Sequence, residues 1–267
     1  MGPSSGPVLF ARYAFGPNRL GLCGPEDWRA LLELGVAGLS AGAADSAARR
    51  PSSARARSDI DSGLRELASG FEGAFPYLQL IAEANGLADA LDPRVVDAYW
   101  IGNSLTDHVD PGLMTRSMEE RFRSKLTTDA WRWLEPKPAA GARPTHAFHV
   151  FDVFPRVGLM STGRLDGALR VMDSCRIRWG TVTEVAGDRL VVGSVPLEMR
   201  GGRLVLGEPR IESVRRWLDG AGFVQEVAVG DTVSLHWDWA CEVLSPSRLG
   251  ALRTRTRRQL ELTNQTV

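Results

Sequence analysis

The sequence predicts an α+β protein: an all-helical N-terminal domain, residues 1–172, followed by a small OB-like β-barrel with a C-terminal helix, residues 173–267. Two observations lead to this prediction. Apolar residues recur at helical spacing over much of the first 126 residues. From Cys175 onward the pattern changes to short alternating runs separated by glycine turns, which is typical of a small, highly curved barrel.

The predicted helices of the N-terminal part have recognisable starts. Proline and two acidic residues open a helix over residues 25–39, where they suit the free amides and the positive end of the helix dipole. Asp92-Pro93 and Asp110-Pro111 each combine an N-cap aspartate with a proline at the first helical position. A further periodic segment covers residues 64–82, and Pro76 is expected to kink or split it.

The stretch from Ala41 to Asp59 contains alanine, glycine, serine and arginine but no large apolar residue. Such a segment buries too little surface to repay the conformational entropy of ordering itself. We therefore expect a mobile surface loop at about residues 41–59.

The barrel part alternates from Ile177 to Val185 and then turns at Gly187-Asp188. Further strands are expected at residues 189–192, 197–199 and 203–206, a helical insert at Ile211–Leu218, and a closing strand at Thr232–Leu244. Ser245-Pro246 then opens a final amphipathic helix.

Charge and cysteine content exclude several classes of protein. Thirty-two basic residues balance thirty-two acidic ones, which argues against a nucleic-acid binder, because such proteins need a net basic footprint. No apolar run reaches the length of a membrane span, and the N-terminal residues do not resemble a signal peptide. Three scattered cysteines do not form a disulfide framework. We expect a reduced, cytoplasmic protein.

His146, His149 and Asp152 are the densest cluster of metal-ligand residues in the N-terminal half. On an α-helix their spacing of three places neighbours side by side, whereas on a strand His149 points away from the other two. Imidazole and carboxylate together suit iron or zinc. The alternative is that these groups hydrogen-bond within an aromatic layer, with Asp152 paired to Arg156.

The barrel offers a thiol and an imidazole within a recognisable frame. Cys175 is followed five residues later by Gly180, and the closing run Gly230-Asp-Thr-Val-Ser-Leu-His236 precedes the C-terminal helix. Residues 174–262 in this order resemble the HypC/HupF family of [NiFe]-hydrogenase maturation chaperones. Those proteins are small barrels that begin with a cysteine, reach a glycine five positions on, and close with a G-D-x-V-x-x-H strand before a helix.

The resemblance implies a carrier rather than an enzyme. Cys175 and His236 match the family residues linked to holding iron, or an Fe(CN)2CO unit, between a HypD-like maturation partner and the hydrogenase large subunit. Thiolate and imidazole suit such iron chemically. Two departures from the family pattern stand out. Cys175 is internal, so it lacks the free α-amino group of an N-terminal cysteine, and the segment between the strands is longer.

The whole chain also looks like an uncharacterised family found in actinobacteria and near [NiFe]-hydrogenase genes. The segments that carry this resemblance are Phe10–Phe15, Ala98–Asn103, Phe148–Val153 and Leu235–Trp239. The leading hypothesis is therefore an accessory protein of hydrogenase maturation that binds iron or docks a maturation partner. The alternatives are a metal-dependent enzyme that uses His146, His149 and Asp152, and a metal-free protein-interaction module.

Overall fold

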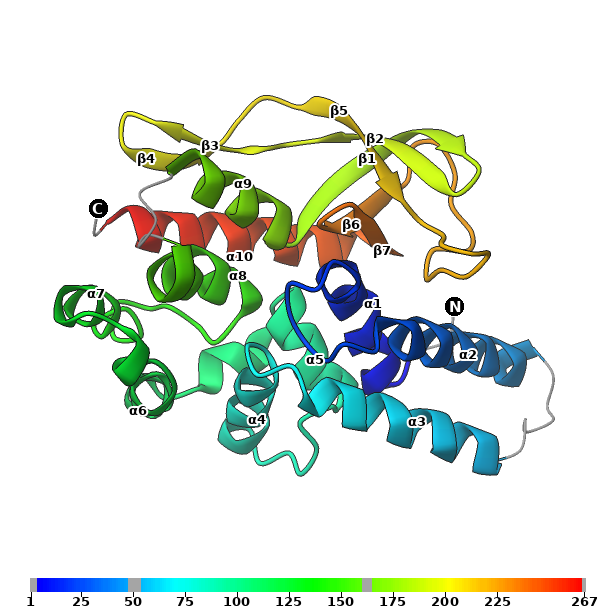
Figure 1. Ribbon diagram of the computed structural model, residues 1–267, viewed down its shortest axis with the longest axis horizontal. Helices are drawn as coiled ribbons and strands as arrows, with labels where there is room; N and C mark the ends of the chain where they lie inside the picture. The colour runs from blue at the N-terminus through cyan, green and yellow to red at the C-terminus, as the bar shows by residue number, and fades with distance from the viewer. Residues whose placement is uncertain (1–3, 48–53, 160–164, 266–267) are drawn as a thin grey trace.

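A computed structural model describes residues 4–47, 54–159 and 165–265. It confirms the α+β class: helices form the N-terminal part, strands follow, and a long helix ends the chain. In Figure 1 the strands lie along the top of the molecule and the N-terminal helices along the bottom, with α10 crossing between them. None of the helices within the described residues is long and apolar enough to cross a membrane.

The helices of the N-terminal part are α1 (Gly6–Arg19), α2 (Trp28–Ala47), α3 (Ala54–Ser69), α4 (Phe75–Ala84), α5 (Pro93–Trp100), η1 (Ser104–His108), α6 (Pro111–Phe122), η2 (Arg123–Lys125), α7 (Thr128–Leu134), α8 (His146–Phe148), η3 (His149–Val153), η4 (Pro155–Leu159) and α9 (Leu165–Cys175). The strands are β1 (Arg178–Ala186), β2 (Arg189–Ser194), β3 (Leu197–Arg200), β4 (Arg203–Leu206), β5 (Arg210–Arg215), β6 (Thr232–His236) and β7 (Trp239–Val243), and α10 spans Pro246–Asn264.

Helix α1 is the centre of the molecule. Every residue from Gly6 to Asn18 is buried, as expected for a helix that is packed on all sides. It contacts α2, α3 and α5 on the helical side and β6 and β7 on the barrel side. The main hydrophobic core consequently runs without a break from the helices into the barrel, where it includes Trp179 and Trp239. The predicted boundary at residues 172/173 falls inside α9.

Gly16 of α1 lies against the ends of β6 and β7. A Cβ added there would lie 2.5 Å from the backbone oxygen of His236 and 3.1 Å from Cβ of Trp239. We therefore expect Gly16→Ala to destabilise the protein by about 1–3 kcal/mol, the usual cost of overpacking a core. Gly250→Ala in α10 is the matched control, because a Cβ there meets no atom within 4 Å. It should stabilise the fold by about 0.5–1 kcal/mol. Urea unfolding of both variants measures the difference, and equal stabilities would contradict the assigned contact.

The capping predictions are confirmed, and the loop prediction is wrong for residues 41–47 and 54–59. The side chains of Asp92 and Asp110 accept hydrogen bonds from the backbone amides of Arg94 and Leu113. Helices α2 and α3 extend over residues 41–47 and 54–59 of the segment expected to be a mobile loop. Alanine and arginine are among the strongest helix formers, so this segment becomes helical without large apolar residues. Residues 48–53 lie outside the described residues.

The expected split of the segment 64–82 is confirmed, because α3 ends at Ser69 and α4 begins at Phe75. Pro76 occupies the first turn of α4, where its missing amide hydrogen costs nothing.

The barrel is closed, with strand order β1-β2-β5-β7-β6 and β6 returning to β1. Neighbouring strands are antiparallel except β5 and β7, which pair in parallel. Its interior is a separate aliphatic cluster that includes Val182, Val214 and Leu235. Five strands in this arrangement make the small OB-like barrel that was expected. The hairpin of β3 and β4, turned by Gly201-Gly202, is attached outside the barrel as a two-stranded sheet.

Two barrel predictions are wrong. Ile211–Leu218 was expected to be helical, but β5 covers Arg210–Arg215 and pairs with β2 and β7. Ile211 is 66% exposed on the outside of the strand, whereas Val214 points into the barrel. The two apolar residues are three positions apart, as in a helix, but they lie on opposite faces of a strand. Thr232–Leu244 is two strands rather than one, because the chain reverses at Trp237 and Asp238 between β6 and β7.

Candidate metal centre

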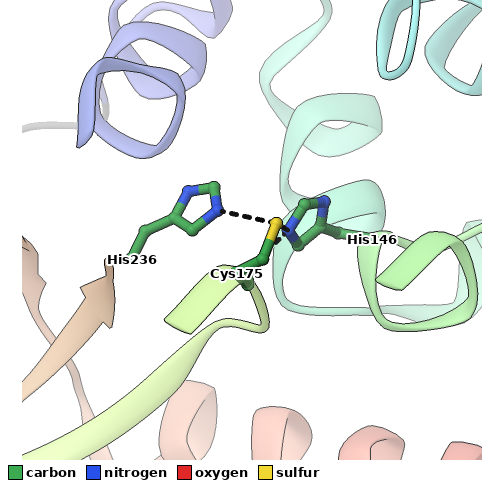
Figure 2. A group of neighbouring side chains, drawn as sticks. All are labelled: His146, Cys175 and His236. Atoms are coloured by element: carbon green, nitrogen blue, oxygen red, sulfur yellow. Dashed lines mark hydrogen bonds between the residues drawn. The ribbon is translucent and has the colours of Figure 1, made fainter. Parts of the chain in front are cut away.

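Three side chains from distant parts of the chain converge at the junction of the helices and the barrel. They are His146, Cys175 and His236, and Figure 2 shows the two imidazoles on either side of the thiol. The Cys175 sulfur lies 3.8 Å from Nε2 of His236 and 4.0 Å from Nε2 of His146. One ligand atom from each residue falls within 4.8 Å of the others.

Barrel closure brings Cys175 and His236 together. Strands β1 and β6 pair antiparallel, with Arg178 opposite Leu235. Cys175 precedes the start of β1 at the end of α9, and His236 is the last residue of β6, so the two lie at the same edge of the barrel. The prediction that this thiol and imidazole are neighbours therefore agrees with the geometry.

His146 comes from the helical part. It begins α8, whose first turn is capped by the side chain of Thr145, an acceptor for the amide of Phe148. Its ring packs against the ring of Trp100 at 4.7 Å and against that of His236 at 5.0 Å between centroids. The ring centroid of Trp100 is also 5.7 Å from that of His236. Trp100 therefore packs against both imidazoles and helps to orient them.

The tautomer of His236 suits a metal ligand. Its Nδ1 is 2.6 Å from the backbone oxygen of Tyr13, and a carbonyl oxygen can only accept, so Nδ1–H must donate. The lone pair is then on Nε2, which faces the Cys175 sulfur. An imidazole held by a backbone carbonyl on the far side is the usual arrangement around a metal-binding histidine.

His146 is arranged differently. Its Nε2 is 2.8 Å from the backbone oxygen of Cys175, so this nitrogen carries the proton and donates it. Nδ1 lies 3.3 Å from the hydroxyl of Tyr99, which can donate to it. For Nε2 of His146 to bind a metal, the proton must leave Nε2 and the hydrogen bond to Cys175 must break. Cys175 and His236 are therefore preorganised ligands, and His146 is a third ligand that requires a change of tautomer.

The three groups are uncharged when no metal is bound. Burial raises the pKa of the Cys175 thiol to about 12 and lowers the pKa of His146 to about 4. Burial also lowers the pKa of His236 well below its usual value. Neutral imidazole is the form that binds metals, whereas the thiol must lose its proton when a metal binds.

The donor set fits a borderline or soft transition metal. A tetrahedral ion with bonds of about 2.3 Å to sulfur and about 2.0 Å to nitrogen holds these atoms roughly 3.5 Å apart. The observed sulfur–nitrogen distances of 3.8 and 4.0 Å are within a few tenths of an ångström of that value. Thiolate and imidazole suit iron, zinc or copper and do not suit magnesium or calcium.

His149 and Asp152 are not part of this group. His149 lies against Tyr77, with 3.5 Å between its Nδ1 and the tyrosine hydroxyl oxygen, and near the ring of Phe122. Residues 149–153 and 155–159 are π-helical, with a wider turn than an α-helix. Residues three apart are consequently not stacked on one face, and the expected cluster of His146, His149 and Asp152 does not form.

Asp152 belongs to a separate buried network. Its carboxylate accepts hydrogen bonds from Gln259 and Thr263 of α10, and Nζ of Lys137 is 3.5 Å from its Oδ1. Arg156, the expected partner of this carboxylate, instead donates to the backbone oxygen of Asp152. Burial raises the pKa of the Asp152 carboxyl to about 6 despite the lysine. Asp152 therefore links α10 to the helical part of the protein and is not part of the candidate centre.

The stability of the metal-free protein should fall when the pH is lowered from 7 to 5. The folded-state pKa of His146, about 4, is below the ordinary value of 6.5, so below pH 6.5 the unfolded chain binds a proton that the folded protein does not. This difference costs about 2 kcal/mol at pH 5, and His149 and His236, whose pKa values burial also lowers, add costs of the same sign. Asp152, whose pKa is raised, offsets roughly 1 kcal/mol of the loss.

The measurement is urea unfolding in the presence of a chelator at pH 7 and pH 5. In His146→Gln the fall in stability should be smaller by about 2 kcal/mol, because the titrating group is gone. An unchanged difference between the two pH values would show that His146 titrates normally in the folded protein.

Comparison with known proteins gives a family but no activity. Neither the search of curated proteins nor the search of solved structures found a match. A family model described as "Family of unknown function (DUF6390)" matches residues 2–267, and the chain therefore belongs to that family.

Proposed function

We propose that this protein is an accessory protein of [NiFe]-hydrogenase maturation that binds iron, alone or as an Fe(CN)2CO unit, through Cys175 and His236. His146 is the third ligand to the iron. The partner in this proposal is a HypD-like maturation protein or the hydrogenase large subunit, and the compartment is the cytoplasm. The observation that carries the proposal is the convergence of one thiol and two imidazoles at the barrel edge.

The geometry supports a metal-binding role in two further ways. His236 holds the tautomer that leaves Nε2 free for a metal, and this arrangement depends on the hydrogen bond that its Nδ1–H donates to the Tyr13 oxygen of α1. Cys175 and His236 also hold the positions that the barrel resemblance assigns to the iron-binding residues. Bound iron would supply the site for diatomic ligands, and the protein's groups would hold and orient it.

The enclosure of the centre bears on how iron would be exchanged. His146 and His236 are 6% and 1% exposed, whereas Cys175 is half-buried. Cys175 is therefore the residue of the centre with the greatest exposed fraction, although burial raises the pKa of its thiol. The enzyme alternative based on His146, His149 and Asp152 is not supported, because these three side chains have separate partners.

The test is infrared spectroscopy and iron analysis of protein purified without oxygen from cells that contain the hydrogenase maturation machinery. The proposal predicts iron together with cyanide and carbonyl stretching bands, both lost in Cys175→Ala. Cys23→Ala is the matched control, because Cys23 is also a free cysteine and is not one of the three residues of the centre. It should retain iron and bands.

Three other outcomes separate the alternatives. Iron without diatomic bands would support a metal site and remove the Fe(CN)2CO cargo from the proposal. Iron that persists in Cys175→Ala would place the metal elsewhere. Protein without iron or any other transition metal would overturn the proposal and favour a metal-free interaction module.

A further inference from the structure

Helix α1 contains a proline, Pro17, close to its end at Arg19. In an α-helix the amide of each residue donates to the backbone oxygen four positions earlier, and proline has no amide hydrogen. The oxygen of Tyr13 is four positions before Pro17, so it lacks its usual donor from within the helix. This oxygen lies 2.6 Å from Nδ1 of His236, which donates to it. The imidazole of the candidate centre therefore replaces the donor that the proline lacks.

The residue before the proline allows the barrel to approach the helix. Gly16 has no side chain, and a Cβ there would lie 2.5 Å from the backbone oxygen of His236. Tyr13 and Gly16 are three positions apart and therefore lie on the same face of the helix. The glycine thus permits a close contact with the end of β6, and Pro17 leaves a backbone acceptor free within that contact.

The side chain of Tyr13 holds this acceptor in place. Its hydroxyl donates to Glu242 of β7, and its ring stacks on Trp100 with 5.6 Å between the centroids. Glu242 is buried and accepts from Nε and Nη2 of Arg248 in α10, at 3.0 and 2.7 Å. Charge-assisted hydrogen bonds of this kind are strong in the protein interior. Tyr13 is consequently anchored to the barrel, and its backbone oxygen stays opposite His236.

The tautomer of His236 decides which of its nitrogens can bind a metal. A neutral imidazole carries one proton, and Nδ1 keeps that proton while it donates to a carbonyl oxygen. Nε2, which is 3.8 Å from the Cys175 sulfur, then presents its lone pair. An amide hydrogen at position 17 would compete with Nδ1–H for the Tyr13 oxygen. The tautomer protonated at Nε2 would gain population, and that tautomer does not bind a metal through Nε2.

We propose that Pro17 is a positioning residue of the candidate centre. Because it has no amide hydrogen, it reserves the Tyr13 oxygen for Nδ1–H of His236 and so keeps Nε2 unprotonated. A hydrogen-bond partner on the far side of a metal-binding histidine fixes the tautomer and orientation of the ring, and its loss lowers metal affinity. The part of this inference that concerns metal affinity rests on the proposed function.

The first measurement uses metal-free protein at pH 7. Nitrogen NMR distinguishes the protonated from the unprotonated ring nitrogen of a neutral histidine, and His236→Gln assigns the signals. We expect Nδ1 of His236 to be protonated in the wild-type protein. In Pro17→Ala, part of the population should move to the tautomer protonated at Nε2. Pro17→Gly restores the same amide hydrogen and should shift the signals in the same direction, so it replaces Pro17→Ala if that variant does not fold.

The second measurement is a Co(II) titration followed by sulfur-to-metal charge-transfer absorption. Pro17→Ala should bind Co(II) about 10-fold more weakly than the wild-type protein. The substitution provides the helix with an additional hydrogen-bond donor, so a weakened helix would not explain this loss. Pro7→Ala is the matched control, because Pro7 is in the first turn of the same helix, where an amide has no acceptor within the helix. It should bind Co(II) as the wild-type protein does.

The two measurements keep this inference distinct from the proposed function. A tautomer shift in Pro17→Ala, together with no Co(II) binding by the wild-type protein, would overturn the metal-binding function and support the role of Pro17. Unchanged His236 signals in the Pro17 variants, or a proton on Nε2 in the wild-type protein, would overturn that role whatever the metal result. An equal loss of Co(II) affinity in Pro7→Ala would also overturn it, because any change in α1 would then have the same effect.

Discussion

Replacing Cys175 with serine is expected to weaken the binding of Co(II) or Fe(II) by at least about 100-fold. Loss of an outer-shell partner alone typically costs 10- to 100-fold in metal affinity, and Cys175 is a direct ligand in the proposed centre. The substitution also removes the only donor at the centre that becomes an anion, which leaves two neutral imidazoles. Neutral nitrogen ligands do not offset the charge of a divalent ion.

Replacing His236 and replacing His146 should weaken metal binding to different extents. His236→Gln should approach the loss seen for Cys175→Ser, because Nε2 of His236 is already unprotonated and faces the sulfur. His146→Gln should lose less, since His146 must first give up its hydrogen bond to the Cys175 oxygen before it can bind. Titrations followed by charge-transfer absorption under anaerobic conditions give these affinities.

His149→Gln is the matched control for removal of an imidazole three residues from His146. Its ring contacts Tyr77 and Phe122 rather than the thiol, so metal affinity should be unchanged. Equal losses for all three histidine variants would point to a general loss of structure. Unchanged affinity in Cys175→Ser would rule out the proposed ligand set.

Replacing Lys137 with methionine should destabilise the protein by about 3–5 kcal/mol at pH 8. Lys137 and Asp152 are 1% and 0% exposed, and removing one partner of such a pair leaves an uncompensated buried charge. The lysine also donates to the backbone oxygen of Leu262 in α10 at 2.9 Å, which would lose this partner. Urea unfolding measures the loss.

The pH dependence of this variant follows from Asp152, whose pKa is already raised to about 6 by burial. Without the lysine, the folded-state pKa rises further above its unfolded value. A raised pKa contributes stability that is present at low pH and lost as the pH increases through it. Lys137→Met should therefore be destabilised more at pH 8 than at pH 5.

Two further variants test the cause of the loss. Adding Asp152→Asn to Lys137→Met removes the isolated charge and should recover part of the stability. Arg132→Met removes a partner from the exposed pair with Asp129, whose side chains are 74% and 91% exposed, and should cost less than about 1 kcal/mol. A loss for Lys137→Met no larger than that of Arg132→Met would show that the buried pair does not stabilise the fold.

The fold was predictable in those places where the signal is local. N-cap aspartates before proline, glycine turns and alternating strands depend on neighbouring residues, and the structure confirms the helices after Asp92 and Asp110 and the hairpin at Gly201-Gly202. Errors occurred in two situations. In one, the apolar residues of a strand are also spaced as in a helix; in the other, the lack of large apolar residues was the only criterion for predicting a loop. The strand at Ile211 imitates a helical spacing, and the alanine-rich residues 41–47 are helical because of backbone propensity.

The candidate centre was predictable only in part, for a physical reason. Cys175 and His236 were paired through the resemblance to a barrel family, and the pairing of β1 with β6 brings them to the same edge of the barrel. His146 was associated with His149 and Asp152, since an α-helical turn would stack residues three apart. The π-helical geometry of residues 149–153 breaks that association, and no sequence spacing encodes it.

The sequence by itself determined the α+β class and the barrel, and the resemblance of the barrel to a known family singled out the thiol and the imidazole. Only the tertiary structure decided that His146 completes the group and that the Tyr13 oxygen sets the tautomer of His236. These contacts join residues up to 223 positions apart. They depend on how α1 and α8 pack against the edge of the barrel. That packing is set by contacts between side chains far apart in the sequence, and local sequence patterns do not contain this information.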